Sequence, residues 1–429
     1  MKEMKESNSL ILGLIPASWS SSKLKYCLKE PMKYGASEAG IDYDDTLPRY
    51  IRITDITSDG KLKDENKLSL GEKQSIGYIL KDNTVLFARS GGTVGKTFLY
   101  RESFGKAAFA GYLISAVTEP TKMLPEWLIY FSNSSCYWEW VNQIFTQATI
   151  QNIGADKYSN MPIPIAPIEV QKRIISYLDL KCSEIDGLSS NIQSEIDTLE
   201  AYKRSVITEA VTKGLDKNAP MKDSGLPWVG KVPQHWMIEK VKYHLTRKET
   251  KNQPDKQVLS VYREYGVIPK DSRDDNHNVT SEDTSKYKYV KQGNLVINKM
   301  KAWQGSMGVS DYEGIVSPAY FIYHFTDNLL VPKYLHYLFR SCYKDEFRRI
   351  SGGIREGQWD LDPDEFANTM VLLPPVQEQK EIIQVIDGKT NEIEATIAKK
   401  KEQLEILADY KKSLIYEYVT GKKEVPTNG

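Results

Sequence analysis

Apolar residues follow a helical period through one long stretch of the chain, and this stretch occurs twice. Residues 167–212 and 375–420 align without a gap, and 17 of the 46 aligned positions are identical. In the first copy, apolar residues recur at spacings of mainly three and four, at Ile185, Leu188, Ile192, Leu199, Tyr202 and Val206. This spacing predicts an apolar stripe on one face of a helix about 70 Å long, and a helix of that length needs a partner along its side.

The apolar stripe shifts sideways along the helix, and this shift indicates how the helix packs against a partner helix. Strict heptads fail at Glu195 and Glu209, where the apolar residue moves to Ile196 and Ala210. The second copy keeps Ile393, Ile397, Leu404, Leu407, Tyr410 and Leu414. A drifting stripe favours an antiparallel pair or a bundle over a two-stranded parallel coiled coil.

Upstream of each helix, short β-branched and aromatic runs predict strands, and Pro125 and Pro332 predict helix starts. Both copies open with the pattern G-x-[I/V]-P-x-x-W, at residues 13–19 and 230–236. The predicted fold is therefore α+β, with two duplicated mixed units, and residues 218–227 form a turn-rich linker. The interiors of the units differ, as expected either for modules that bind different targets or for simple drift.

Bulk composition excludes several classes of protein. The chain has 57 Lys+Arg and 57 Asp+Glu, so any nucleic-acid-binding face must be a local patch. Its four cysteines are far apart, which indicates reduced thiols in a cytoplasmic protein. No apolar run has the length of a membrane span, and the histidines show no metal-binding spacing.

One stretch is similar to a phosphate-binding loop. Residues 90–97 read S-G-G-T-V-G-K-T, which matches the end of G-x-x-x-x-G-K-[ST] but not its first glycine. No helical pattern follows, so we favour a basic, glycine-rich loop over a nucleotide site.

Polar and basic residues gather in the variable interiors. Arg and Lys suit guanine edges and phosphates, and Asn and Gln suit adenine edges. The candidate nucleic-acid contacts are Arg89, Ser90, Thr93, Lys96, Gln147, Gln151 and Asn152 in the first copy, and Lys299, Lys301, Trp303, Gln304, Arg355 and Gln358 in the second. Each one alone is more often an ordinary surface residue, so the hypothesis rests on the clusters.

The ordered motifs resemble the specificity subunit of type I restriction-modification systems. The resemblance is carried by P-x-x-x-Q-K-x-I-I at Pro167 and Pro375, the helix after each, and the entry segment 223–236. The family usually has P-P-x-x-E-Q at the helix start. Residues 374–379 fit this pattern, whereas the first copy departs from it at Ala166 and Val170.

The resemblance implies two target recognition domains, 1–165 and 217–372, each reading half of a bipartite, asymmetric double-stranded DNA site. It implies two conserved helical spacers, 166–216 and 373–424, packed as an antiparallel coiled coil about a pseudo-twofold axis. The helix residues expected to form the spacer and meet partners are Gln171, Ile185, Leu199, Tyr202, Gln379, Ile393, Leu407 and Tyr410.

By the same resemblance, this chain is non-catalytic and binds no cofactor. Two methyltransferase subunits and two restriction subunits would assemble on it and would hold S-adenosylmethionine, ATP and Mg. Two alternatives stay open: a coiled-coil adaptor that binds only proteins, and an enzyme that uses residues 95–97 as a nucleotide loop.

Overall fold

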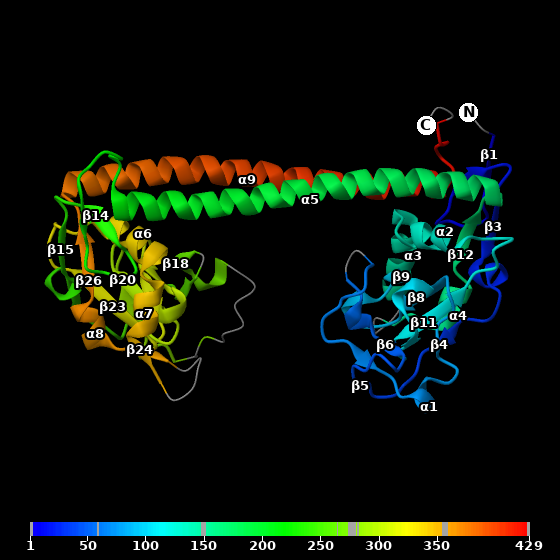
Figure 1. Cartoon of the computed structure of the whole chain (residues 1–429), viewed down its shortest axis with the longest axis horizontal. Helices are drawn as coiled ribbons and strands as arrows, with labels where there is room; N and C mark the ends of the chain where they lie inside the picture. The colour runs from blue at the N-terminus through cyan, green and yellow to red at the C-terminus, as the bar shows by residue number, and fades with distance from the viewer. Residues whose placement is uncertain are drawn as a thin grey trace. The chain divides into compact units, whose positions relative to one another are not determined.

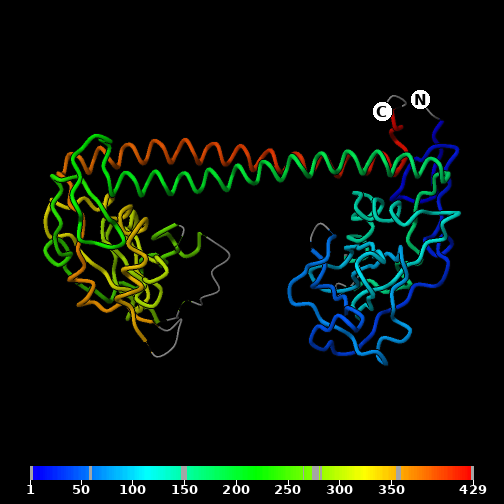
Figure 2. The backbone as a smooth tube through the Cα atoms, in the orientation of Figure 1, coloured from blue at the N-terminus to red at the C-terminus, as the bar shows by residue number. Residues whose placement is uncertain are grey.

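The chain folds into two compact units, each of which contains a segment of both long helices. The computed structural model describes residues 3–57, 60–146, 152–263, 265–272, 280, 283–353 and 359–426. Unit 1 comprises Met1–Ile192 and Lys401–Gly429, and unit 2 comprises Gln193–Lys400. The N-terminal segment and the end of the last helix therefore belong to the same unit (Figure 2).

The centre of unit 1 is an antiparallel sheet in the order β4-β11-β8-β9. Its strands are β4 (Lys33–Tyr34), β11 (Leu113–Val117), β8 (Thr84–Ala88) and β9 (Thr97–Leu99). All five residues of β8 are buried, because the strand has a core on both faces. Val85 and Phe87 join the core beneath the helices, and Leu86 joins a second core. Figure 1 shows α2 and α3 between this sheet and α5.

Unit 2 repeats this sheet with the same strand order, β16-β23-β20-β21. The strands are β16 (Leu245–Arg247), β23 (Tyr320–Phe325), β20 (Leu295–Asn298) and β21 (Met307–Val309). The remainder differs between the units. Unit 1 adds a sheet of β10 (Ala107–Phe109), β6 (Arg49–Ile51), β7 (Leu68–Ser69) and β5 (Ile41–Asp42). Unit 2 adds the pairs β17 (Leu259–Tyr262) with β18 (Gly266–Pro269) and β19 (Lys288–Val290) with β22 (Gly314–Val316).

Three helices flank each central sheet at equivalent places in the chain. They are α2 (Pro125–Ser132), α3 (Ser135–Thr146) and α4 (Ala155–Ser159) in unit 1, and α6 (Pro332–Cys342), α7 (Lys344–Arg349) and α8 (Pro363–Asn368) in unit 2. The predicted proline starts of α2 and α6 are confirmed.

Two-stranded sheets complete each unit. They are β1 (Met4–Glu6) with β2 (Leu14–Pro16), β3 (Ser20–Lys23) with β12 (Pro162–Ile165), β13 (Met221–Asp223) with β14 (Lys231–Pro233), β15 (Met237–Lys240) with β26 (Met370–Leu373), and β24 (Ser351–Gly352) with β25 (Asp360–Leu361). Residues 218–227, predicted as a turn-rich linker, also contain strand β13, which pairs with β14.

Both repeats form long helices, as predicted. Helix α5 spans Ile168–Lys213 and α9 spans Val376–Val419. Within unit 1, Asp186 pairs with Lys411 (2.6 Å) and the ring of Tyr177 packs on that of Tyr418. Within unit 2, Glu195 pairs with Lys400 and Lys203 with Glu394 (3.0 Å). In each unit the residue numbers rise along one helix as they fall along the other, so the helix segments are antiparallel.

The apolar stripe is confirmed only in part. Ile185, Ile196, Ile393 and Ile397 are buried, and Leu199 and Leu407 are partly buried. The prediction is wrong for Leu188, Tyr202 and Tyr410, which remain 53%, 51% and 54% exposed. A period of 3.6 residues drifts away from a fixed seam, so some positions of a three-and-four pattern turn towards solvent.

The Pro-x-x-Trp motif at the start of each unit receives the end of a long helix. Gly214 and Gly421 follow α5 and α9 with φ of 72°, a left-handed conformation that suits glycine. A Cβ at Gly214 would approach Trp236, and one at Gly421 would collide with Pro16 and approach Trp19. The motif therefore packs against a helix terminus in both units.

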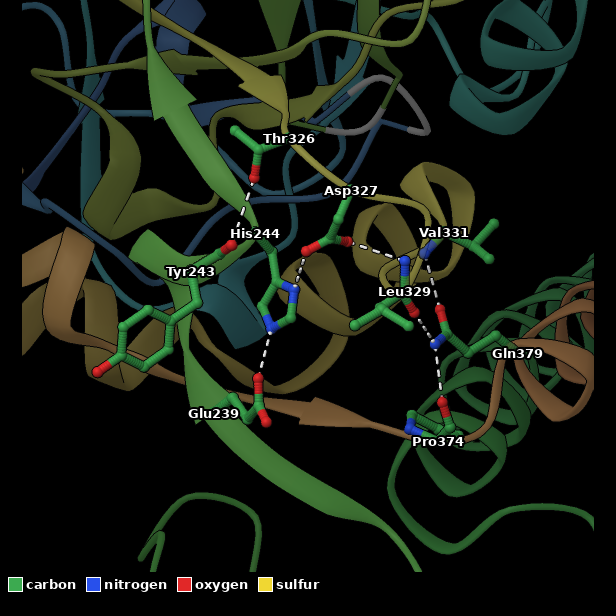
Figure 3. A network of polar contacts seen from close by, with 9 residues as sticks. All are labelled: Glu239, Tyr243, His244, Thr326, Asp327, Leu329, Val331, Pro374 and Gln379. Carbon is green, nitrogen blue, oxygen red and sulfur yellow. Dashed lines mark hydrogen bonds and ion pairs between the residues drawn. The ribbon is translucent and has the colours of Figure 1, made fainter.

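Buried glutamines fix the start of each long helix to its unit. Gln171 accepts the Leu124 N–H (3.0 Å) and donates to the carbonyls of Lys122 and Ala166. Gln379 repeats this arrangement with the Val331 N–H (2.8 Å) and the carbonyls of Leu329 and Pro374 (Figure 3). Both side chains are fully buried, so they are structural residues and do not face a partner.

A buried histidine fixes the loop before α6, residues 327–331, which Gln379 also contacts. His244 is 1% exposed, and its ring nitrogens lie 2.8 Å from Asp327 and 3.1 Å from Glu239 (Figure 3). Asp327 also accepts the Leu329 N–H (2.8 Å). The loop before α6 is thus held by His244 at one end and by Gln379 at the other.

Tyrosines also attach each unit to its long helix. Tyr130 donates to Asp179 and Tyr337 donates to Asp387, both at 2.5 Å. Burial, with the neighbouring carboxylate, raises the pKa of both phenols and so favours the protonated form that donates these hydrogen bonds.

The departure from P-P-x-x-E-Q in the first copy has a structural consequence. In unit 2, Glu378 accepts the indole N–H of Trp236 (3.0 Å). In unit 1 the equivalent position is Val170, and the indole nitrogen of Trp19 is buried without a partner among the described residues. An unpaired buried donor costs about 1–3 kcal/mol.

Val170→Glu is therefore expected to stabilise unit 1 by about 1 kcal/mol, because it supplies the missing acceptor for Trp19. The reciprocal change, Glu378→Val, should destabilise unit 2 by about 1–3 kcal/mol. Denaturant unfolding followed by tryptophan fluorescence measures both effects, with the exposed Glu405→Val as control. Loss of stability in Val170→Glu would contradict this account.

Candidate nucleic-acid interface

Each central sheet carries a turn at the same place. In unit 1 the turn joins β8 to β9 through the 3-10 turn η3 (Gly91–Thr93), and in unit 2 it joins β20 to β21 through η7 (Ala302–Gln304). Most of the described candidate contacts lie on these two turns: Arg89, Ser90, Thr93 and Lys96 on one, and Lys299, Lys301, Trp303 and Gln304 on the other. Gln147, Gln151, Arg355 and Gln358 lie outside the described residues.

The residue that begins each turn is held by the same main-chain hydrogen bonds. The Arg89 N–H donates to Tyr112 O, and Arg89 O accepts the Ile153 N–H (2.8 Å). The Lys299 N–H donates to Ala319 O, and Lys299 O accepts the Leu361 N–H (2.8 Å). Arg89 and Lys299 are therefore structurally equivalent, although neither repeat pattern nor composition pairs them.

The Arg89 side chain is held in a defined orientation in unit 1. Its guanidinium lies 4.7 Å from the ring centre of Tyr34, a cation–π contact. Its Nε donates to Asn152 Oδ1 (3.3 Å), and its Nη1 donates weakly to Gly111 O (3.4 Å). Its Nη2 has no partner among the described residues. Ser90 also pairs with Asn152 in an isolated antiparallel β-bridge of the main chain. The structure thus brings Arg89, Ser90 and Asn152 together.

Lys299 has a different electrostatic setting. Its Nζ lies 2.8 Å from Asp360, the residue equivalent to Asn152. The ion pair offsets the lysine charge, whereas Asn152 leaves Arg89 with its full charge. Asp360 was missed by sequence reasoning, although it aligns with Asn152 in the repeat.

The rest of the unit 2 turn is aromatic and polar. The rings of Trp303 and Trp359 lie 5.5 Å apart, and Arg348 lies 5.9 Å from the Trp359 ring. Gln304 Oε1 accepts from Arg263 (2.6 Å), and Lys301 is exposed. Partly exposed tryptophans beside cations can contact bases or sugars.

The unit 1 turn is not a phosphate-binding loop of the P-loop type. Such a loop leads into a helix whose N-terminus faces the phosphates. Here Lys96 and Thr97 enter strand β9, and η3 is a three-residue turn. Thr97 Oγ1 is hydrogen-bonded to Ser132 Oγ (2.6 Å), so it is not placed as a magnesium ligand.

Lys96 lines a cleft at the β9 edge of the unit 1 sheet, and Arg89 is not among the residues that line it. The cleft has a volume of about 1600 Å³ and is lined by residues of β9, α2, α3, α9 and the segments around 43–67 and 104–106. Lys96 and Lys106 line it without a side-chain partner among the described residues, and Phe104 at its rim is 48% exposed. Sequence reasoning could not assemble this cleft, because its walls come from distant segments.

Neither a metal site nor a membrane-spanning helix is found among the described residues. Within them, no three or more His, Cys, Asp and Glu side chains gather in a way that would hold a metal ion. None of the helices described combines the length and apolar character of a membrane span.

Comparison with known proteins gives consistent similarities. A family model described as "Type I restriction modification DNA specificity domain" matches residues 24–197 and 243–405. The type I restriction enzyme EcoKI specificity subunit of Escherichia coli (strain K12) is 23% identical over 384 residues, covering 82% of this chain and 77% of that protein. The putative type I restriction enzyme MjaX specificity subunit of Methanocaldococcus jannaschii is 24% identical over 437 residues, covering 97% and 96%.

A solved structure shares the fold. It comes from work on complex assembly and conformational transition of the type I R-M system and matches with a TM-score of 0.69 at 13% identity. The match covers 95% of this chain and 99% of the other.

Proposed function

This chain belongs to the family of type I restriction modification DNA specificity domains, and from that premise we propose that it is the DNA-reading specificity subunit of such a complex. Each unit reads one half of a bipartite, asymmetric double-stranded DNA site. The chain itself is non-catalytic and works in the cytoplasm. Two methyltransferase and two restriction subunits assemble on it and hold the S-adenosylmethionine, ATP and Mg that the reactions need.

The observation that carries the proposal is that the two units share one sheet architecture but place different side chains on the equivalent turns. The two central sheets have the same strand order, and Arg89 and Lys299 have the same main-chain hydrogen bonds. The side chains around them differ: Arg89 with Asn152 and Tyr34 in unit 1, and Lys299 with Asp360 in unit 2. One scaffold that presents different donors and acceptors suits the reading of two different base patterns.

Methylation mapping of a genome that carries this chain and its methyltransferase subunit tests the proposal. The expected result is one bipartite motif with modified bases in both half-sites, which is lost when this chain is deleted. A protein-only adaptor predicts no sequence-selective DNA retention by the complex, and that outcome would overturn the proposal.

Arg89→Ala is expected to relax recognition at one position of the unit 1 half-site. The guanidinium can offer two donors to a guanine edge, and a bidentate contact of this kind contributes about 1–3 kcal/mol of discrimination. Discrimination should fall roughly 5- to 150-fold at that position, while the other half-site is unchanged. Binding selection on a library of half-site variants measures it.

Two further variants test whether the effect of Arg89→Ala comes from a base contact. Arg89→Lys keeps the charge but loses the planar fork, so it should relax discrimination at the same position. Arg173→Ala, an exposed arginine on α5, is the matched control. An equal loss of affinity for every sequence in Arg89→Ala would show a phosphate contact and contradict base reading by Arg89.

A further inference from the structure

The cleft in unit 1 carries an excess of positive charge. Six of its lining residues are cationic (Arg49, Lys61, Lys67, Lys96, Lys106 and Lys412) and three are acidic (Asp45, Asp64 and Glu139). Asp64 lies 2.8 Å from Lys67 and 3.8 Å from Arg49, so it is beside these two cations and not beside the other lysines of the cleft. The surplus is contributed mainly by Lys96, Lys106 and Lys412.

These three lysines come from separate elements and reach the same cleft. Lys96 lies directly before β9, Lys106 directly before β10, and Lys412 on α9. Lys96 is partly buried, and Lys106 and Lys412 are exposed. Among the described residues, Lys412 pairs with Asp409 at 3.0 Å, and the side chains of this pair are 65% and 78% exposed. Such a surface pair contributes little and does not hold the lysine back from another anion.

Two neighbouring lysines of α9, Lys411 and Lys412, point to different surroundings. In the repeated pair Lys411-Lys412, Lys411 is used between helices, where it contacts Asp186 at 2.6 Å. Lys412 is the next residue and lines the cleft instead. The other repeat has the same division, with Lys203 paired to Glu394 and Arg204 70% exposed.

We propose that this cleft is a binding track for the phosphodiester backbone of DNA, and that α9 takes part in it directly through Lys412. The inference rests on the proposed function and extends it, because it makes a long helix a DNA-contacting element as well as a spacer. The track positions the half-site but does not read it, since lysines on phosphates carry no sequence information. Reading is left to Arg89, whose guanidinium lies over Tyr34 of β4, the edge strand opposite β9.

The size of the cleft and the separate origin of its cations favour a polymer backbone over a small ligand. Sites for small molecules usually have volumes of about 300–1000 Å³ and a few polar groups that converge on the ligand. This cleft is larger, and its cations lie on three separate elements. Lysines on three separate elements suit contact with successive phosphates of a backbone.

The test is the salt dependence of DNA binding by the complex of this chain with its methyltransferase subunit. Each phosphate contact contributes about 0.9 to the slope of log K against log salt concentration. Lys96→Gln, Lys106→Gln and Lys412→Gln should each reduce the slope by about 0.9 and should leave base preference unchanged. Lys401→Gln is the matched control, because Lys401 is exposed on α9 in unit 1 and does not line the cleft.

The outcomes separate the track from the proposed function. If the wild-type complex selects a sequence but the three variants keep its slope, the track is refuted and the proposed function stands. If the wild-type complex selects no sequence, the proposed function fails, and slopes on non-site DNA still test the track. An unchanged slope for Lys412→Gln alone would remove α9 from the track. Displacement of DNA by 1 mM ATP at constant ionic strength, or by phosphate, would show a small-anion site and refute it.

Discussion

Replacing Gln379 with alanine is expected to destabilise unit 2 by about 2–4 kcal/mol, a large effect for one polar residue. The change removes three hydrogen bonds and leaves the Val331 N–H and the carbonyls of Leu329 and Pro374 without their buried partner. Each abandoned group costs about 1–3 kcal/mol unless water reaches it, and partial relaxation lowers the sum. The melting temperature should fall by roughly 5–15 °C.

Calorimetry of the full chain with its methyltransferase subunit measures this effect. Gln171→Ala should behave in the same way in unit 1, because its three hydrogen bonds have the same geometry. Gln403→Ala is the control, since Gln403 is an exposed residue of α9 and the helix-propensity change is identical. A Gln379→Ala protein within about 0.5 kcal/mol of the wild type would contradict the structural role assigned to Gln379.

Lengthening both long helices by one heptad is expected to change the DNA site that is recognised. Seven residues add about 10.5 Å of helix and keep the helix face within about 20°. If α5 and α9 set the spacing of the half-sites, the spacer should grow by up to about three base pairs, at about 3.4 Å each. Methylation of the original site should then be lost and a site with a longer spacer should appear.

The structure fixes where the insertions belong. Glu195 and Gln403 are equivalent in the repeat, but Glu195 faces Lys400. Insertions after Glu195 and after Lys400 therefore keep the remaining pairs in register. A heptad in α5 alone is the control, because Asp186–Lys411 and Lys203–Glu394 could not then both form. An unchanged spacer in the doubly extended protein would refute a ruler role for the helices.

The helices of the fold were largely predictable, because the patterns that predict them lie within short stretches of sequence and occur in both repeats. The repeat predicted α5 and α9, and Pro125 and Pro332 marked the starts of α2 and α6. The drifting stripe favoured an antiparallel pair, and the ion pairs within each unit confirm it. The first-copy departure at Val170 was visible in the sequence, although its effect on Trp19 needed the structure.

The candidate interface was predictable only where it is local. The clusters after β8 and β20 were found because each lies on one turn, and they fall on equivalent turns in the two units. The cleft was not found, because Lys412 is more than 300 residues from Lys96 and only the tertiary structure brings them together. Gln171 and Gln379 were predicted to belong to the spacer and partner surface, yet both are buried anchors.

The way in which Arg89 and Lys299 are held has a consequence for how such a protein changes over time. Both residues are fixed by main-chain hydrogen bonds, which any amino acid other than proline can make. Under the proposed function, substitution there alters the chemistry offered to DNA while the supporting bonds persist. A new target preference can thus arise by single mutations that leave folding intact, and each unit can acquire one independently of the other.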